Sequence, residues 1–288
     1  MNNLGVRIPG KVIITGEHSV VYGKLALAAS LNLGVKVWVE KGERGDIHIL
    51  ENDNKGLVRK AIEVAGGDET IRIKIESELP VGSGLGSSAA VAAGVIKGVR
   101  EYLEKPITSE ELFELTMEVE KVAHGNPSGV DPATVVYGGL IGYIKGQRIE
   151  RLRVLKPFKV LLVNSGKPSE STKEMVELVA INTKKEQIIK EIGEVSRKIR
   201  DKLVGGDEIF ELINENGLLL EQLGVVGERA RELSEELRKE GSFVKITGAG
   251  GVETGSGMMM VVAKDLEKTK RLLDNGQAQY FETVIGER

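Results

Sequence analysis

Apolar and polar positions along the first half of the chain follow two periods, one typical of strands and one typical of helices. Alternating apolar residues predict strands over 11–15, 35–39, 47–50 and 71–75. Apolar residues at helical spacing predict helices over 57–64, 87–103 and 109–123. The helix over 87–103 is the most apolar of these, so most of it is expected to lie in the core.

The second half begins with a new apolar strand after a glycine pair and a basic stretch. Gly138 and Gly139 precede that stretch at 148–156, and the strand follows at 159–163. Helical patterns then fill 172–203 and 207–239, and the remaining elements are strands at 244–247 and 257–262, a helix at 265–273 and a strand at 280–284. The order predicts an α+β protein with two domains, 1–155 and 156–288, the second resembling a ferredoxin-like arrangement with inserted helices.

Composition narrows the possible functions. The chain has 288 residues and a net charge of −3, so it lacks the basic balance that nucleic acid binding usually requires. It has no cysteine, which excludes disulfides, thiolate nucleophiles and cysteine metal sites and leaves oxygen ligands for any metal. The N-terminal MNNLGVRIPGK has no signal-peptide pattern and no segment is apolar enough for a membrane span, so a soluble cytoplasmic protein is expected.

A glycine-serine loop lies between a predicted strand and the long apolar helix. Its glycines allow close backbone approach to a ligand, and the helix start offers unpaired N–H groups that favour phosphate. A P-loop has lysine after its last glycine and a Rossmann turn has glycine where Ser87 stands, so neither fingerprint matches. A plain turn with a serine cap is the alternative. The candidate nucleotide-binding residues are Pro80, Val81, Gly82, Ser83, Gly84, Leu85, Gly86, Ser87, Ser88, Ala89 and Ala90.

Two further segments carry polar groups at high density. PGKVIITGEHSVVYGK contains Lys11, Glu17 and His18, each of which on its own could be a solvated or structurally satisfied residue. EKVAHGNPSGVDPA has Glu120 near the end of a helix and Asp131 in the glycine-proline loop expected after it. Both carboxylates could reach one pocket, and such oxygen ligands suit Mg²⁺. The alternative is a turn aspartate and a solvated glutamate.

A second glycine-rich loop lies between two predicted strands near the C-terminus. In KITGAGGVETGSG, the residues Gly248, Ala249, Gly250 and Gly251 would permit close backbone approach to an anion. A flexible hairpin connection explains the same composition, so this segment alone does not decide between them.

Together these segments resemble the GHMP kinase superfamily over nearly the whole chain. Three motifs in the family's order carry the resemblance: PGKVIITGEHSVVYG, PVGSGLGSSAA and KITGAGG. The GEHSVVYGK and HGNPSGVDPA segments are similar to those of mevalonate kinases, in the short archaeal form. The resemblance implies a two-domain fold with an N-terminal ribosomal-protein-like α/β domain, which binds ATP, and a C-terminal ferredoxin-like domain.

The resemblance also implies roles for single residues. Asp131 matches the catalytic base and Lys11 the cation beside it, while Ser88 and Glu120 match ligands of Mg²⁺. It further implies that the glycine-serine loop holds the triphosphate of ATP and that adenine lies near the strands at 35–50 and the loop at 52–56. The residues implied for binding mevalonate are Glu17, His18 and, in SGKPSESTKEM, Thr172. The implied partner is this small molecule, with no nucleic acid or membrane, and a homodimer is one alternative for the assembly.

One departure from the family pattern keeps other functions open. The family's third motif usually runs GAGGGG, whereas GAGG is followed here by VETGSG, and Glu253 is expected to point away from transferred phosphate because of charge repulsion. The alternatives are a related kinase for a sugar, a homoserine-like alcohol or phosphomevalonate, and a ligand sensor on the same fold that performs no transfer.

Overall fold

The computed structural model describes residues 5–42, 55–80, 82–125 and 127–286, which form two compact units. The first unit consists of 1–11, 32–81 and 86–138, and the second of 12–31, 82–85 and 139–288. The strand predicted at 47–50 and most of the region predicted to hold adenine lie outside the described residues. The domain boundary between residues 155 and 156 stays a prediction.

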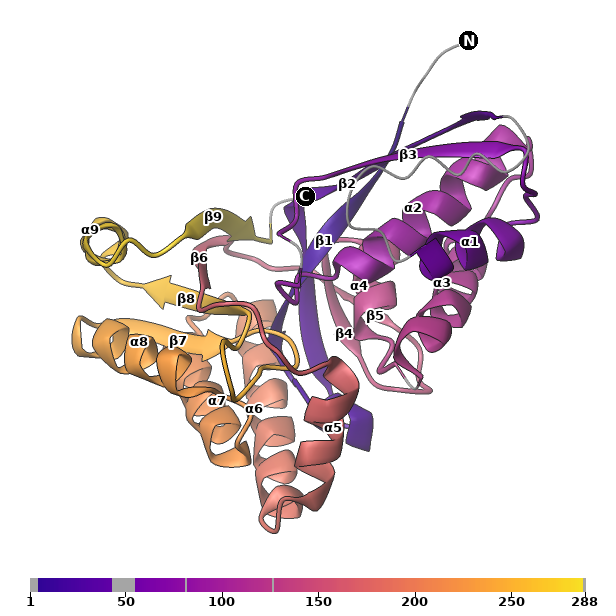
Figure 1. Cartoon of the computed structure of the whole chain (residues 1–288). Helices are drawn as coiled ribbons and strands as arrows, with labels where there is room; N and C mark the ends of the chain where they lie inside the picture. Colours follow the sequence, from indigo (N-terminus) through magenta and orange to yellow (C-terminus); the bar gives the residue numbers. More distant parts are fainter. Residues whose placement is uncertain (1–4, 43–54, 81, 126, 287–288) are drawn as a thin grey trace. The chain divides into compact units, whose positions relative to one another are not determined.

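The first unit packs four helices together and against strands (Figure 1). The strands are β1 (Val6–Thr15) and β2 (Ala26–Lys41), which continue into the second unit, and β3 (Ile71–Ser77), which pairs antiparallel with β2. The helices are α1 (Lys55–Val64), α2 (Ser87–Tyr102), α3 (Ser109–His124) and α4 (Val130–Tyr137). Helix α2 packs closely on β2, since a Cβ at Gly94 would lie 2.7 Å from Cγ2 of Val37. This packing fixes the N-terminus of α2, which follows the glycine-serine loop.

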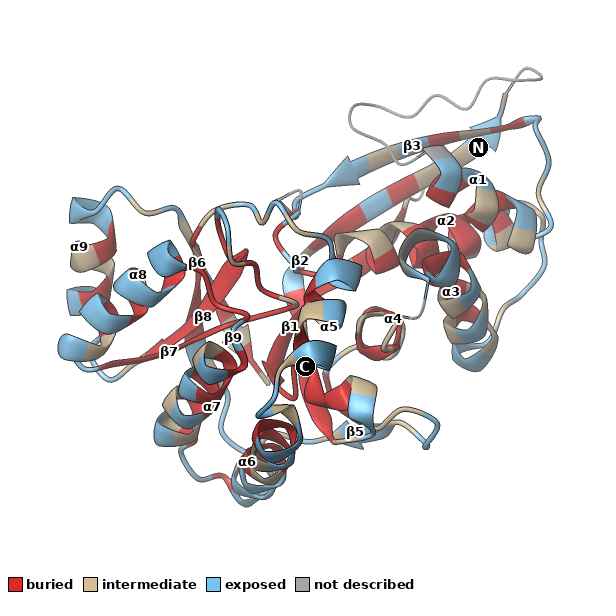
Figure 2. Cartoon of the chain, turned by 60° about the horizontal axis from the view of Figure 1, so that its bottom comes forward, coloured by how far each residue is buried: buried red, intermediate tan, exposed pale blue. Residues whose placement is uncertain are grey.

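The second unit is built on an antiparallel sheet of order β7-β8-β6-β9. Its strands are β6 (Phe158–Asn164), β7 (Ser242–Ile246), β8 (Met258–Ala263) and β9 (Tyr280–Ile285). Its helices are α5 (Thr172–Ile181), α6 (Lys185–Gly205), α7 (Phe210–Leu223), α8 (Glu228–Lys239) and α9 (Leu266–Asn275). Figure 2 shows β7 and β8 buried and the outer sides of α6, α7 and α8 exposed, so the core lies between helices and sheet. The first residues of β2 pair in this unit with β4 (Leu140–Tyr143), which pairs with β5 (Glu150–Leu152).

The predicted α+β class is confirmed, and the two long helical segments of the second half each divide in two. Helix α5 ends at Ile181, and Oδ1 of the next residue, Asn182, accepts a hydrogen bond from the N–H of Lys184 at 2.8 Å. This local bond offers the backbone an alternative to continuing the helix. Helix α7 ends at Leu223, and the next residue, Gly224, is left-handed at φ 81°. The helices on either side of both breaks bury apolar residues, so the apolar pattern alone did not reveal where each helix ends.

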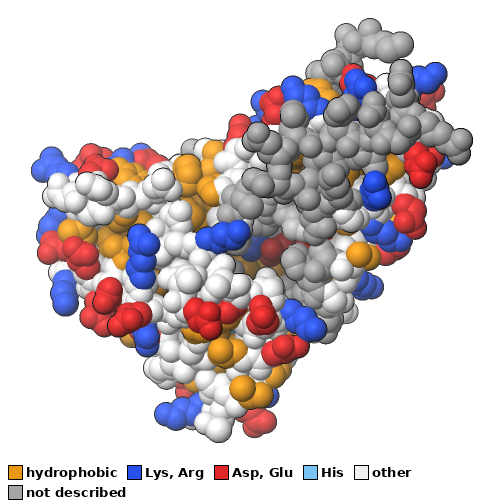
Figure 3. Space-filling model, in the orientation of Figure 1, with side chains coloured by type: hydrophobic (Ala, Val, Ile, Leu, Met, Phe, Trp, Pro, Cys, Tyr) orange, Lys and Arg blue, Asp and Glu red, His pale blue; other side chains and the backbone are white. Residues whose placement is uncertain are grey.

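The surface of the described residues mixes both signs of charge. On the face drawn in Figure 3, basic and acidic side chains alternate over the coloured atoms without forming a continuous basic stripe. None of the helices in the described part of the chain is long and apolar enough to span a membrane.

Candidate functional site

Lys11 and Asp131 form an ion pair within the first unit. Lys11 lies on β1 with its side chain only 2% exposed, and its Nζ lies 3.0 Å from Oδ1 of Asp131, whose side chain is 34% exposed. The ammonium group is therefore held inside the protein while the carboxylate can still be approached from outside. Such a pair can accept a proton and stabilise negative charge in one place.

Asp131 lies in the first turn of α4, so the prediction that it lies in a loop was wrong. The helix begins directly after Gly129, and Pro132 follows Asp131 within the first turn. Proline was taken as a loop signal, but it is tolerated in the first turn of a helix because its missing N–H would have had no partner there. A carboxylate at this position also lies at the positive end of the helix dipole.

Ser88 and Glu120 form a second oxygen pair in the first unit. The hydroxyl of Ser88, in the first turn of α2, donates to Oε1 of Glu120 on α3 at 2.5 Å, and Glu120 is 4% exposed. Among the described residues no group of three or more His, Cys, Asp or Glu side chains could hold a metal. Two hard oxygen donors fit Mg²⁺, which usually takes one or two protein ligands and completes its shell with water and phosphate.

In the second part of the glycine-serine loop, from Gly86 onward, the side chain of Lys11 limits the space beside the backbone. Gly86 caps α2 in the left-handed region at φ 76°, and a Cβ there would lie 2.7 Å from Cγ of Lys11. Glycine is therefore required for both the backbone angle and the space. Leu85, Ala89 and Ala90 are buried and anchor the loop in the core, while Ser87 and Ser88 are half-buried at the helix start.

The first part of the same loop packs on the C-terminal glycine-rich segment, within the second unit. The carbonyl of Ser83 accepts from the N–H of Met258 at 3.1 Å, and a Cβ at Gly84 would lie 3.1 Å from the carbonyl oxygen of Thr247. The hydroxyl of Ser83 is buried without a hydrogen-bond partner among the described residues. A buried hydroxyl of this kind can bind a ligand oxygen. Pro80 is half-buried, and Val81 lies outside the described residues.

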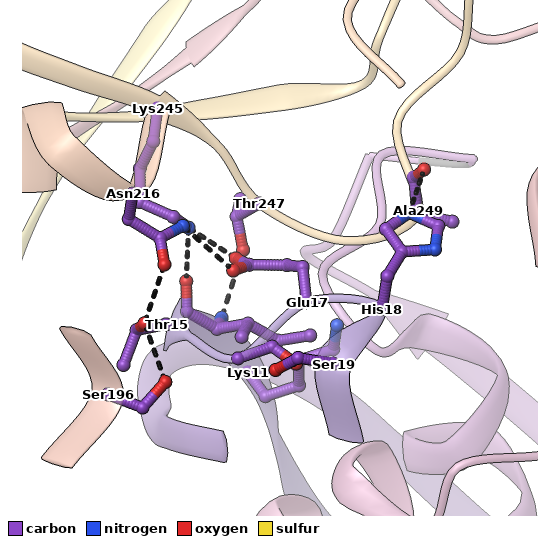
Figure 4. A network of polar contacts seen from close by, with 12 residues as sticks. Lys11, Thr15, Glu17, His18, Ser19, Ser196, Asn216, Lys245, Thr247 and Ala249 are labelled. Carbon is purple, nitrogen blue, oxygen red and sulfur yellow. Dashed lines mark hydrogen bonds and ion pairs between the residues drawn. The ribbon is translucent and has the colours of Figure 1, made fainter. Parts of the chain in front are cut away.

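Glu17 lies in a buried polar network of the second unit, drawn in Figure 4. Its Oε1 pairs with Nζ of Lys245, and both side chains are almost completely buried. Lys245 also donates to the carbonyl of Ile13 at 3.0 Å. Asn216 donates to Oε2 of Glu17 at 3.4 Å and accepts from the hydroxyl of Thr15 at 2.7 Å. The network satisfies two opposite charges that would be costly to bury alone.

His18 links the first motif to the second glycine-rich loop, at residues 248–251, in the same unit. Its Nε2 lies 2.9 Å from the carbonyl oxygen of Ala249, as Figure 4 shows. Burial lowers the pKa of His18 to about 4, although the bond to Ala249 acts in the opposite direction. The ring is therefore neutral at pH 7, with the proton on Nε2 and an acceptor lone pair on Nδ1.

The second glycine-rich loop, residues 248–257, carries the family's third motif in an atypical form and is called the third loop below. Glu170 holds this loop in place. The carboxylate Oε1 accepts from the N–H groups of Val252 and Glu253, each at 2.8 Å. Burial acts to raise the pKa of Glu170, but these donors outweigh it and lower the pKa. The loop also approaches the chain closely at Gly250, where a Cβ would lie 2.0 Å from the carbonyl oxygen of Val225, and the N–H of Gly251 donates to that oxygen at 3.1 Å.

Comparisons with known proteins identify the family. A family model described as the GHMP kinases N terminal domain matches residues 55–139. The mevalonate kinase of Thermococcus gammatolerans is 37% identical, with 84% of this chain and 85% of that protein covered. That of Archaeoglobus fulgidus is 36% identical, with 84% and 88% covered. The chain belongs to the mevalonate kinase family. The crystal structure of the Methanococcus jannaschii mevalonate kinase is 26% identical and has a TM-score of 0.82, with 99% of each chain covered.

In this member of the mevalonate kinase family, the structure brings together two of the predicted pairs: Lys11 with Asp131, and Ser88 with Glu120. It also brings His18 to Ala249 of the third loop. Thr172 is exposed at the start of α5, between Ser171 and Glu174, the two residues that form the capping box of this helix. The roles predicted for these residues stay predictions.

Lys245 and Asn216 were missed by sequence reasoning, although both contact Glu17. Lys245 begins the KITGAGG motif, so its position next to a glycine-rich loop was a signal, but its partner is 228 residues away. No local pattern predicts such a pairing. Asn216 lies in the middle of α7, where a buried asparagine is unusual enough to have indicated a polar partner.

Proposed function

We propose that this protein transfers the γ-phosphoryl group of ATP to the primary C5 hydroxyl of mevalonate, giving 5-phosphomevalonate for isoprenoid biosynthesis. The observation that carries the proposal is the distance of 3.0 Å between Nζ of Lys11 and Oδ1 of Asp131. Membership of the mevalonate kinase family supports the choice of acceptor. A cytoplasmic location is part of the proposal, supported by the absence of cysteine.

In the proposed reaction, Asp131 accepts the proton of the mevalonate hydroxyl. The hydroxyl oxygen forms a bond to the γ-phosphorus, while the bond from that phosphorus to the bridging oxygen breaks and ADP leaves with the electron pair. Lys11 stabilises the negative charge on the attacking oxygen and the transferred group, because its ammonium lies beside the base. The partial exposure of Asp131 leaves the carboxylate accessible to the acceptor.

The donor triphosphate is proposed to lie on the glycine-serine loop. The hydroxyl of Ser83 is buried without a hydrogen-bond partner in the described part of the chain, so it can donate to a phosphate oxygen. The helix start at Ser87 offers backbone N–H groups of the kind that bind phosphate. Ser88 and Glu120 are proposed to hold Mg²⁺. When bound, this ion would neutralise charge on the β- and γ-phosphates.

The acceptor is proposed to contact His18 and Thr172. Neutral His18 donates through Nε2 to Ala249, which leaves Nδ1 as an acceptor for a hydroxyl group. Thr172 is exposed and can offer its hydroxyl. Glu17 is buried against Lys245, so its contribution to the acceptor end is to fix the backbone from which His18 extends.

A substrate panel tests the proposal. Purified protein with ATP and Mg²⁺ is offered mevalonate, phosphomevalonate, galactose and homoserine, and ADP release is measured with a coupled assay. Mevalonate should give the highest kcat/KM, and removal of Mg²⁺ by chelation should abolish turnover. A strong preference for another acceptor would assign the protein to a different substrate, whereas binding of ATP and mevalonate without product would identify a sensor.

A further inference from the structure

Lys167 lies against the glycine-serine loop, although it is far from that loop in the sequence. It stands between β6 and α5 in the second unit and is exposed. A Cβ built on Gly82 would lie 3.1, 3.4 and 3.5 Å from Cε, Cγ and Cδ of Lys167. The methylene stem of the lysine therefore runs along the backbone of Gly82 and brings its ammonium group to this loop.

The ammonium group of Lys167 is available to a ligand. Among the residues that the structure describes, its Nζ has no ion pair within 4.0 Å and no hydrogen bond. The neighbouring hydroxyl of Ser83 is buried and likewise lacks a hydrogen-bond partner in the described part of the chain. An ammonium group beside Gly82 and an unsatisfied hydroxyl on the next residue, Ser83, favour an anionic ligand with oxygen acceptors.

The backbone of Lys167 is fixed by the atypical third loop. The hydroxyl of Thr254 donates to the carbonyl of Lys167 at 2.9 Å, and the N–H of Gly257 donates to the carbonyl of Gly166 at 2.9 Å. The loop passes so close that a Cβ at Gly255 would lie 2.3 Å from the carbonyl carbon of Gly166. The VETGSG segment therefore holds the position from which the lysine reaches the glycine-serine loop.

Two backbone donors of the same loop are bonded within the protein and are therefore not available to an anion. The N–H groups of Val252 and Glu253 donate to the carboxylate of Glu170 instead. Glu253 also adds a negative charge to this segment. The positive side chain of Lys167 would offset both the engaged donors and this negative charge.

We propose that Lys167 binds the phosphate groups of the nucleotide held on the glycine-serine loop. This inference rests on the proposed function, since it takes that loop as the triphosphate site. Lys167 supplies a side-chain cation to a loop that has no lysine of its own between Pro80 and Ala90.

Binding measurements on three variants test the proposal. Lys167→Met keeps the methylene packing on Gly82 but removes the charge, Lys167→Arg keeps a charge, and Lys198→Ala changes an exposed lysine on α6. Calorimetry with ATP and Mg²⁺ should show a 5- to 20-fold increase, roughly, in Kd for Lys167→Met. Lys167→Arg should stay within about threefold of the wild type, and Lys198→Ala should be unchanged. The loss of affinity in Lys167→Met should vanish for adenosine, which has no phosphate, and should become smaller at high salt.

Several results would overturn the proposal. These are an unchanged Kd for ATP in Lys167→Met, an equal loss for adenosine, or an equal loss in Lys198→Ala. The titration needs no acceptor, so it is independent of the choice of mevalonate. A wild-type protein that binds ATP but does not phosphorylate mevalonate would contradict the proposed function and leave the result for Lys167 valid. A wild type without measurable affinity for ATP would overturn both.

Discussion

The ammonium group of Lys11 lies 3.0 Å from the carboxylate of Asp131, and the two side chains differ greatly in exposure. The lysine is closely surrounded because it is buried and because a Cβ on Gly86 would lie only 2.7 Å from its Cγ. The aspartate extends from the first turn of a helix toward an accessible side. This difference suits a pair in which the base must meet a substrate and the cation must keep its place.

Replacing Asp131 by asparagine should lower kcat for mevalonate phosphorylation by about 10²- to 10⁴-fold, the usual effect of a positioned base. The amide cannot accept the hydroxyl proton, while its size is almost unchanged. Steady-state kinetics and ATP calorimetry check this, and the Kd for ATP should change by less than about threefold. Glu114→Gln, an exposed carboxylate on α3, is the matched control and should keep wild-type kcat. Unchanged kcat in Asp131→Asn would refute its role as base.

Replacing Ser88 by alanine should raise the Mg²⁺ concentration needed for half-maximal activity by about tenfold or more, because one of two proposed oxygen ligands is lost. Titration of Mg²⁺ at saturating ATP measures this. Ser109→Ala, at the exposed start of α3, is the control and should leave the Mg²⁺ dependence unchanged. Equal Mg²⁺ dependence in Ser88→Ala would remove this residue from the metal site.

Most of the first unit could be predicted from sequence, because its elements carry strong local signals. The helix at α2 has a long apolar face and a glycine-serine loop before it, and the structure places its start at the predicted Ser87. Helix α4 was missed because it has only eight residues and contains Pro132, so the local signals for a loop outweighed its apolar face.

The candidate site was predictable only where a motif carried it. Lys11 and Asp131 stand in separate motifs. The resemblance of both motifs to one kinase family indicated that the two residues act in the same site. The contacts of Glu17 with Lys245 and of Lys167 with Gly82 join segments that share no pattern in the sequence. Such pairings depend on how strands and loops pack, so they follow from the tertiary fold rather than from local propensity.

Replacing Gly86 by alanine should reduce kcat and destabilise the protein by about 1–3 kcal/mol, because a left-handed backbone and crowding against Lys11 act together. Gly23→Ala separates the two effects. Gly23 has nearly the same left-handed backbone, with φ 73° and ψ 19°, but a Cβ there would meet nothing within 4 Å. Urea unfolding and kinetics of both variants check this, and the loss of kcat should be confined to Gly86→Ala. An equal effect of both substitutions would show that crowding of Lys11 is unimportant.

Replacing Lys245 by methionine should lower the free energy of unfolding by about 3–5 kcal/mol, because the buried carboxylate of Glu17 loses the cation that compensates its charge. The double variant that adds Glu17→Gln should recover part of this loss, since the uncompensated charge is removed. Urea unfolding measures both variants, with Lys198→Met as the control for loss of an exposed lysine. A loss below about 1 kcal/mol in the single variant would contradict the buried pair.

His18 should contribute to the dependence of stability on pH. Its pKa is lowered from 6.5 to about 4 by burial, so between these values the unfolded chain binds a proton that the folded chain does not. Stability from His18 is therefore fully present above pH 6.5 and is lost as the pH falls through 6.5 toward 4. The loss amounts to at most about 3 kcal/mol, from the difference of the two pKa values.

His18→Asn tests this dependence, because asparagine is one of the residues that most often adopt a positive φ, which is 57° at this position. Urea unfolding of wild type and variant at pH 7.5, 5.5 and 4.5 should show the wild type losing about 1–3 kcal/mol relative to the variant as the pH falls. An NMR titration of the imidazole gives the folded pKa directly, and the variant identifies its resonance among those of the three histidines. A measured pKa near 6.5, or parallel stability curves, would mean that the ring is solvated and that its bond to Ala249 is not maintained in solution.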